Sequence, residues 1–582
     1  MAKAAGIDPG QRQLNGPQTT GRDYRNLSAP IHGVRCDEDV AITVRDGVEL
    51  MADVHRPAGD GRFPALIAAS PYPRQIQNLG APMGFIEAGA TDFWVPRGYV
   101  HVIANLRGTG GSGGTFGFFD AQERRDLYDL VEWAAEQPWC DGNVGMIGIS
   151  YFAMAQLEAA VERPPHLRAI FPVAVTTDLY EAAVHHGLFS SGFVTPFLAM
   201  VGLTSGRSDR FWRSDLLEAA RAVLHTKPLH HRFATMNGES SVAVLHAALK
   251  LHHDPHPWDD LWQAMAVEHP LRDAWWDERD LRPLLDRVEV PTYLGCDWDN
   301  VPLHLPSTFA AFRDLTGAPV TRVGMLGEFG LTWPWESLHV EALAWYDHWL
   351  KGHDTGILDG PAIRYWLPGA EEWRASDVWP PQTVAHRALA LRADGELGED
   401  AGPPGERSFL VLGEGLGRST GSVGETAQLE WTSVPLEHDL DVVGEIEVEL
   451  RATATAIDTA WIITLQDVAP DGATVDVTAG WLRASLREVD PERSRPGAPE
   501  LPCRRAAAVV TGRMTIYRIP LVSTARRFSA GNRLRLVITG DDHDPATPAI
   551  MGFRHAPVGT SSLNSIHSSS RLLLPIDEGP TP

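Results

Sequence analysis

Hydrophobic residues follow a strand–helix rhythm in the first part of the chain. Short, almost uninterrupted apolar runs occupy residues 63–70, 99–105 and 143–149, whereas residues 122–137 place their apolar side chains on one face of a helix. Short apolar runs are typical of buried parallel strands, and the three-to-four spacing is typical of amphipathic helices. Their alternation predicts a parallel sheet with right-handed crossovers.

The rhythm stops after Thr177. Residues 179–287 are rich in Leu, Ala, His and Trp and contain no convincing strand, which predicts a helical cap inserted over the carboxyl edge of the sheet. The sheet is expected to resume with a strand, a helix, a strand and a closing aromatic-rich helix, at residues 290–296, 306–315, 320–326 and 335–351.

The pattern changes again near residue 360. Gly, Pro and Thr increase, and apolar and polar residues alternate at 445–450, 461–465 and 533–538, as in an antiparallel sandwich with one buried face. Near the other end, residues 40–54 predict a hairpin. We therefore expect an N-terminal arm, an α/β domain in two segments, a helical cap and a C-terminal β-sandwich, at residues 1–36, 37–178 with 288–355, 179–287 and 356–582.

Composition narrows the classes of partner. The chain of 582 residues carries a formal net charge of −25, and such a surface repels phosphate backbones, so nucleic acid is not expected as a partner. The sequence contains no apolar run of bilayer length and no apolar signal core near its start, and neither membrane insertion nor export is expected. The four cysteines are widely spaced, without metal-ligand spacing, which favours a reduced, cytoplasmic protein.

Candidate chemistry centres on Ser150. Residues 143–156 predict a strand, a sharp turn carrying this serine, and a helix that begins at once. A serine on such a bend projects its hydroxyl above the first helical amides, as a nucleophile requires. Phe152 occupies the second glycine position of the usual Gly-x-Ser-x-Gly elbow. An ordinary strand-to-helix turn remains the alternative.

A serine nucleophile needs an acid and an oxyanion hole, and the sequence offers both. Asp299 follows the strand that ends at Cys296, where the acid of an α/β-hydrolase belongs. Tyr72 stands between two prolines at the same predicted sheet edge, and its phenol could donate to an oxyanion together with the Tyr151 backbone N–H. A turn aspartate and a structural Pro-Tyr-Pro loop are the alternatives.

Nearly the whole chain resembles the cocaine-esterase, α-amino-acid ester hydrolase and X-Pro dipeptidyl-peptidase family of serine hydrolases. The resemblance is carried by residues 40–57, Pro71-Tyr72, 107–113, 139–145, the Gly148–Tyr151 elbow, His269-Pro270, Asp273, Trp276 and Trp298-Asp299. It implies an α/β-hydrolase core, a helical cap and a C-terminal jelly roll. It also implies that Ser150 is the nucleophile, that Asp299 is the acid, and that Tyr72 and Tyr151 form the oxyanion hole. No cofactor or metal is implied, and a homo-oligomer is compatible with the family.

One part departs from the family. The family's catalytic base is the histidine of a segment resembling Gly-Pro-Trp-x-His. In this chain Leu331 stands at the histidine position. No histidine occurs between His304 and His339. His304, five residues after Asp299, is the first candidate for a relocated base, followed by His185 and His186 of the cap, whereas His339 is expected to pack or cap along the closing helix. The cluster His252, His253, Asp254 and His256 is interpreted as a solvated loop rather than a metal site.

Three functional hypotheses follow. The first is a serine hydrolase that acts on an ester or amide with a bulky acyl group through an acyl-enzyme at Ser150. The second is a non-hydrolytic relative, either a binding protein or an enzyme that uses the same pocket for a lyase or rearrangement step, and Leu331 motivates it. The third, carbohydrate binding by the C-terminal sandwich, rests on fold analogy alone.

Overall fold

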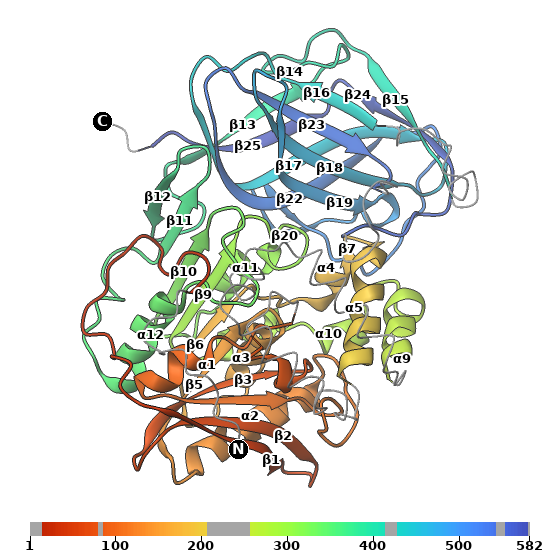
Figure 1. Ribbon diagram of the computed structural model, residues 1–582. Helices are drawn as coiled ribbons and strands as arrows, with labels where there is room; N and C mark the ends of the chain where they lie inside the picture. The colour runs from red at the N-terminus through yellow and green to blue at the C-terminus, as the bar shows by residue number, and fades with distance from the viewer. Residues whose placement is uncertain (1–13, 80–84, 206–256, 414–427, 543–552, 580–582) are drawn as a thin grey trace.

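The computed structural model describes residues 14–79, 85–205, 257–413, 428–542 and 553–579. Within them, ten strands form one mixed sheet that lies below an all-β domain in Figure 1. The order across this sheet is β1-β2-β4-β3-β5-β6-β9-β10-β11-β12. Neighbours from β4 to β11 are parallel, and antiparallel strands stand at both edges.

The strands of the sheet fall close to the predicted apolar runs. Their bounds are β1 Val34–Thr43, β2 Glu49–Pro57, β3 Phe63–Ser70, β4 Val100–Asn105, β5 Cys140–Ile149, β6 Leu167–Val173, β9 Thr292–Asp297, β10 Thr321–Leu326, β11 Ile363–Leu367 and β12 Glu372–Ser376. Seven of the eight residues of β3 and all six of β4 are buried. Burial on both faces explains why these runs are continuous rather than alternating.

Helices pack against the sheet as expected, with one shifted start. They are α2 Ala121–Glu136, α3 Tyr151–Val161, α11 Leu305–Asp314 and α12 His339–Lys351. The closing helix was predicted from residue 335 but begins at His339, because Leu338 adopts a left-handed conformation with φ of 62°. A non-glycine residue in that region interrupts a right-handed helix.

The cap is helical in its described part. It comprises α4 Leu179–Ala183, α5 Ser191–Thr204, α9 Trp258–Gln263 and α10 Ala274–Asp277, and α4, α5 and α9 lie to the right of the sheet in Figure 1. A two-stranded ribbon, β7 Val184–His185 with β8 Leu188–Phe189, was not predicted. The histidine cluster at residues 252–256 lies outside the described residues.

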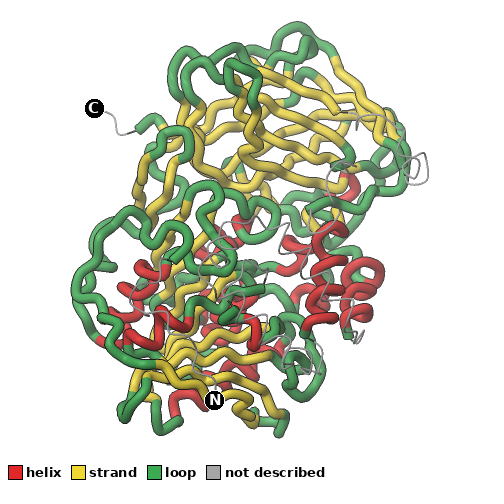
Figure 2. Tube along the Cα trace, viewed as in Figure 1, coloured by secondary structure: helices red, strands yellow, loops and turns green. Residues whose placement is uncertain are grey.

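The C-terminal part is built of strands, as Figure 2 shows. One sheet has the order β14-β13-β25-β17-β24-β15, with β22 also paired to β17, and a second has the order β16-β23-β18-β19. Their strands are β13 Val384–Leu391, β14 Leu397–Gly398, β15 Glu406–Val411, β16 Gln428–Thr432, β17 Leu440–Ala454, β18 Ala460–Val468, β19 Thr474–Arg483, β22 Thr515–Phe528, β23 Arg533–Thr539, β24 Ser562–His567 and β25 Arg571–Asp577. All pairings are antiparallel, as the alternating pattern predicted.

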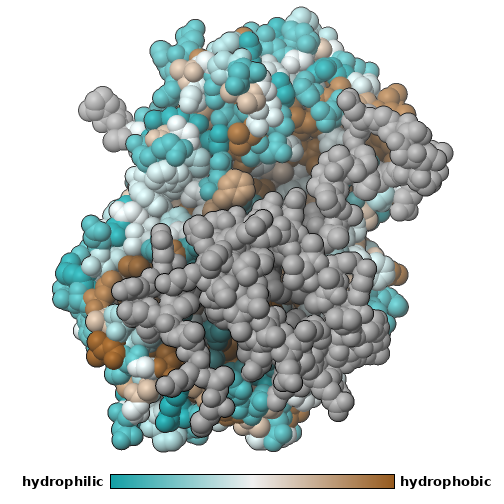
Figure 3. All heavy atoms as spheres, viewed as in Figure 1, coloured by the Kyte–Doolittle hydropathy of each residue, from teal (hydrophilic) through white to brown (hydrophobic). Residues whose placement is uncertain are grey.

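The lower sheet extends further along the chain than the change in composition near residue 360 indicated. Strand β11 adds parallel to β10, and β12 returns antiparallel to it, so the lower sheet continues beyond residue 355. The domain limits given above remain predictions. The surface of the upper domain seen in Figure 3 is mainly hydrophilic, with scattered hydrophobic residues.

The described part of the N-terminal arm lies along the start of α12. The Asn15 backbone N–H donates to Glu336, the Thr20 N–H and hydroxyl donate to Glu341, and those of Ser28 donate to Asp347. Three carboxylates that would otherwise be costly to bury are thereby hydrogen-bonded to the arm.

Candidate active site

Ser150 sits on a strained turn between β5 and α3. Its φ of 59° and ψ of −120° are unusual for a residue with a side chain, and its hydroxyl does not cap the helix. The turn is held because the Ser150 N–H donates to Val173 and the Ala153 N–H donates back to the Ser150 carbonyl. A Cβ at Gly148 would lie 2.2 Å from the Phe152 side chain, so this glycine accommodates the bulky residue at the second elbow position.

Tyr72 faces Ser150 across the sheet edge. The Ser150 side chain and the Tyr72 phenol line the same cavity, and burial raises the pKa of that phenol well above its usual value. The phenol therefore keeps its proton. The Tyr72 backbone is fixed at both ends, because its N–H donates to Ser70 Oγ and its carbonyl accepts from Asn105 Nδ2 at 2.7 Å.

Glu87 is a second polar neighbour of Tyr72, and sequence reasoning missed it. The side chain is 2% exposed, and burial raises the pKa of its carboxyl well above the usual value. Its charge, when present, would raise the pKa of Tyr72 further. Among the described residues, its Oε2 atom has no hydrogen-bond partner. A neutral carboxylic acid thus lies beside the phenol.

Asp299 and Asp297 hold the loop that lacks the histidine. The Asp299 carboxylate accepts from the Phe329 N–H, and the Asp297 carboxylate accepts from the Leu331 N–H at 3.0 Å. Asn300 also donates to Asp297, and burial raises the pKa of Asp297 to about 6. Asp297 was not singled out from the sequence, although it ends β9 two residues before Asp299.

His304 lies in the wall of the same cavity as Ser150. Its Nδ1 atom is 3.0 Å from Thr176 Oγ1. Burial lowers the pKa of His304 to about 3, so the ring is neutral at pH 7. No hydrogen bond or ion pair joins His304 to Asp299 within the described residues, so the two are not paired as a family triad would pair them.

The other histidines considered as candidates have partners away from Ser150: His185, His186 and His339. His185 Nε2 donates to the Pro302 carbonyl and Nδ1 lies 2.6 Å from His555. His186 contacts the Trp481 carbonyl and Glu181. His339 Nε2 accepts from the Ala90 N–H, in agreement with the packing role expected for it. Burial lowers the pKa of both His185 and His186.

The cavity above Ser150 is largely apolar. Tyr72, Ser150, Thr176 and His304 supply its polar side chains. The rest of the wall comes from the turn before α2, from α3, from the cap and from the loop after β9, and includes Phe118, Phe119, Met154, Phe193, Phe197 and Met265. The two phenylalanines before α2 were not singled out from the sequence.

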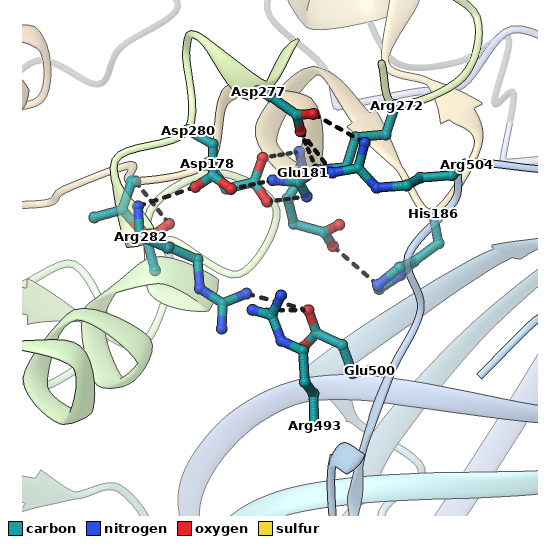
Figure 4. Close-up of polar contacts among 12 residues, drawn as sticks. Asp178, Glu181, His186, Arg272, Asp277, Asp280, Arg282, Arg493, Glu500 and Arg504 are labelled. Atoms are coloured by element: carbon teal, nitrogen blue, oxygen red, sulfur yellow. Dashed lines mark hydrogen bonds and ion pairs between the residues drawn. The ribbon is translucent and has the colours of Figure 1, made fainter. Parts of the chain in front are cut away.

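An ion network joins the cap to the C-terminal domain beside this cavity (Figure 4). Arg272 binds Asp178 at 2.6 Å and also pairs with Asp277 and Asp280. Arg504 of the C-terminal domain reaches Asp277 at 2.7 Å, and Arg282 reaches Glu500 at 3.5 Å. Asp178 caps α4, whose Leu179, Ala182 and Ala183 line the cavity. The network therefore anchors one wall of the site.

Two family models match consecutive parts of the chain. Residues 46–329 match the X-Pro dipeptidyl-peptidase (S15 family) model, and residues 355–549 match the X-Pro dipeptidyl-peptidase C-terminal non-catalytic domain model. The chain belongs to this family of hydrolases, and the α/β-hydrolase fold expected from the sequence is confirmed.

Individual relatives extend over almost the full chain. Cocaine esterase from Rhodococcus sp. (strain MB1 Bresler) is 26% identical, over 92% of this chain and 98% of its own. A putative Xaa-Pro dipeptidyl-peptidase from Streptomyces avermitilis is 21% identical, over 85% of this chain and 77% of its own.

Solved structures show the same fold. A CocE/NonD family hydrolase from Staphylococcus aureus has a TM-score of 0.72 at 21% identity, covering 95% of this chain and 98% of its own. An α-amino acid ester hydrolase has a TM-score of 0.67 at 18% identity, covering 96% and 99%. In the described segments, none of the helices has the length and apolar character needed to cross a membrane.

Proposed function

We propose that this protein is a serine hydrolase that cleaves an ester or amide with a bulky apolar acyl group through an acyl-enzyme at Ser150. The observation that carries the proposal is the placement of Ser150, on its strained turn, and the Tyr72 phenol in the wall of one apolar cavity. An apolar wall with few polar groups is the usual form of a small-molecule site.

In the proposed reaction, Ser150 Oγ attacks the substrate carbonyl carbon. The Tyr72 hydroxyl and the Tyr151 backbone N–H donate to the oxygen that becomes negative. The bond to the alcohol or amine then breaks, the leaving group receives the proton, and water hydrolyses the acyl-enzyme by the reverse sequence of proton transfers. Protonated Tyr72 suits this role because a phenolate could not donate.

We assign His304 as the proton acceptor. The ring of His304 is neutral, and a neutral imidazole carries a proton on one ring nitrogen. The other nitrogen of the neutral ring is then an acceptor. Asp299 acts in this scheme on the loop at Phe329 rather than on the base.

The test is covalent labelling. A fluorophosphonate probe is expected to label wild-type protein, with the adduct located at Ser150 by peptide mass spectrometry. Ser150→Ala should not react, and the matched variant Ser529→Ala, in the C-terminal domain, should react like wild type. An adduct that persists in Ser150→Ala would remove Ser150 as the nucleophile.

The second candidate, a non-hydrolytic relative, is favoured by Leu331 at the position where the family carries its base. It predicts neither labelling nor turnover with p-nitrophenyl esters of aryl and alkyl acids and with X-Pro amides. Turnover of any of these substrates that is lost in Ser150→Ala supports the hydrolase instead.

We also propose a cytoplasmic location and a small-molecule substrate. All four cysteines, each within the described residues, are free thiols, and reduced thiols are typical of the cytoplasm.

A further inference from the structure

Glu123, on the first turn of α2, contacts two separate parts of the candidate site. Its carboxylate accepts from the Tyr151 hydroxyl, with Oε1 at 2.9 Å and Oε2 at 3.1 Å. Its Oε2 atom also accepts from the Phe119 backbone N–H at 3.0 Å. Tyr151 follows the nucleophile, and Phe119 lines the cavity, so one side chain joins the elbow to the aromatic wall.

The Glu123 carboxylate is buried, and its surroundings favour its role as an acceptor. It is 4% exposed and lies against a second buried acid, Glu158 of α3. Burial and the neighbouring charge raise the pKa of Glu158 well above its usual value. Glu123 receives hydrogen bonds from a backbone N–H and a phenol, which favour its charged form. Burial raises the pKa of Glu123 as well, to about 7, and its hydrogen bonds with the Phe119 N–H and the Tyr151 hydroxyl oppose that rise. Glu158 therefore holds its proton more firmly than Glu123, whose oxygens serve as the acceptors for both donors.

The turn that Glu123 holds is strained. Phe118 and Phe119 have φ values of 58° and 60°, in the left-handed region that bulky side chains rarely adopt. Such a conformation persists only when its surroundings fix it. Here Arg279 donates to the Phe118 and Gly117 carbonyls at 3.0 and 3.1 Å, and Glu123 accepts from the next N–H.

The nucleophile elbow and the aromatic wall of the cavity also contact each other directly. The Phe119 ring stacks on the Tyr151 ring, with centroids 4.4 Å apart and planes 16° apart. Neither ring can move without disturbing the other. The Tyr151 ring is fully buried, and its hydroxyl is fixed by Glu123.

We propose that Glu123 is a positioning residue that sets two functions at once: the Tyr151 end of the nucleophile elbow, whose backbone N–H is the oxyanion donor, and the Phe118–Phe119 turn, which selects an aromatic acyl group. The proposal rests on the proposed function for its catalytic half. Its specificity half concerns the shape of the cavity and is independent of whether Ser150 is acylated.

The catalytic half predicts a loss in kcat rather than in KM. An oxyanion donor acts mainly in the transition state, and removal of one donor typically lowers kcat by about 10²-fold to 10³-fold. Glu123→Ala is expected to lower kcat by about 10²-fold because the donor is displaced rather than deleted. Glu123→Gln keeps an acceptor oxygen and should recover most of this loss. The control Glu132→Ala lies on the same helix, where its carboxylate binds His166, and should resemble wild type.

The two halves can be separated by Tyr151→Phe. This variant removes the phenolic hydroxyl but keeps the hydrogen bond from the Phe119 N–H to Glu123. It is expected to lower kcat while keeping the ratio of kcat/KM for benzoyl and hexanoyl esters. Glu123→Ala should lower both kcat and that ratio, the latter by about fivefold or more. Equal effects of the two variants on the ratio would overturn the specificity half, and an unchanged kcat in Glu123→Ala would overturn the catalytic half.

Binding measured without turnover distinguishes this proposal from the proposed function. In Ser150→Ala protein, calorimetry should show that benzamide binds more tightly than hexanamide, and that adding Glu123→Ala removes the preference. If wild-type protein hydrolyses nothing but this preference is lost, the hydrolase proposal fails and the specificity role stands. If the preference is unaffected by Glu123→Ala in a correctly folded protein, the specificity role is wrong.

Discussion

The backbone N–H of Leu331 donates a 3.0 Å hydrogen bond to the carboxylate of Asp297. The loop at which the family carries its catalytic histidine is therefore held in place by main-chain contacts, and Asp299 adds another through Phe329. The loop keeps its attachment to the acidic end of β9 although the imidazole is missing.

This geometry predicts that Leu331→His increases activity. An imidazole placed beside Asp297 and Asp299 would supply a second proton acceptor, and general-base catalysis contributes typically about 10²-fold to 10⁴-fold. Steady-state kinetics with p-nitrophenyl esters should show kcat at least about tenfold above wild type. Leu331→Asn, a polar variant without a basic nitrogen, should show no gain. Equal kinetics for the two variants would contradict the prediction.

His304→Ala should lower kcat by about 10²-fold or more if this ring accepts the proton of Ser150. Burial lowers the pKa of the His304 ring to about 3, so the wild-type rate should not fall near pH 6.5, where an exposed histidine titrates.

The same shift affects stability. Because the His304 ring binds a proton more readily in the unfolded chain than in the folded protein, it should reduce the free energy of unfolding as pH falls from 6.5 toward 3. The control His166→Ala, on a half-exposed ring, should match wild type, and an unchanged kcat in folded His304→Ala would exclude His304 as the base.

Glu87→Gln should stabilise the protein increasingly as pH rises. Burial raises the pKa of Glu87 in the folded protein, so the folded chain keeps a proton that the unfolded chain releases above about pH 4.5. The wild-type carboxyl then costs about 1.4 kcal/mol of stability for each pH unit between the two pKa values. Thermal unfolding at pH 5 and pH 8 should show a larger gain in Tm for the glutamine variant at pH 8. A pH-independent difference would show that Glu87 is ionised in the folded state.

Arg272→Ala should destabilise the protein by about 3–5 kcal/mol, because Asp178 and Asp280 would remain buried without their cation. The Arg272 side chain is 12% exposed, whereas that of Arg504 is 51% exposed and shares Asp277 with it. Arg504→Ala is the matched control and should cost less than about 1 kcal/mol. Urea unfolding monitored by tryptophan fluorescence measures both. Similar losses would mean that burial does not decide the strength of this network.

The hydrophobic pattern predicted helices and strands well where burial alone determines which residues are apolar. The continuous apolar run of β3 is buried almost throughout, and the strand–turn–helix at Ser150 follows from its residues. The start of α12 was predicted too early because nothing in the sequence indicates that Leu338 adopts a left-handed conformation. The ribbon of β7 and β8 was missed because two-residue strands are too short for a period to appear.

The candidate site was predicted in part for a related reason. Ser150, Tyr72 and Asp299 lie at strand ends, which topology brings to one edge. Glu87 and Glu123 reach the site from a loop and a helix, and their roles depend on burial and on partners distant in the chain. A sequence shows a carboxylate but not the loss of solvent around it, so such residues emerge only from three-dimensional contacts.

The ion network of Figure 4 also limits how the domains of this protein can be exchanged with those of relatives. The region matched by a model described as non-catalytic contributes Arg504 and Glu500 to the same network that fixes the cap helix α4. Chimeras that graft the hydrolase part onto another relative's C-terminal region would therefore alter the cavity unless both halves of these ion pairs were transplanted together. The shape of the cavity is then a property of the two domains together, and neither can be exchanged alone without changing it.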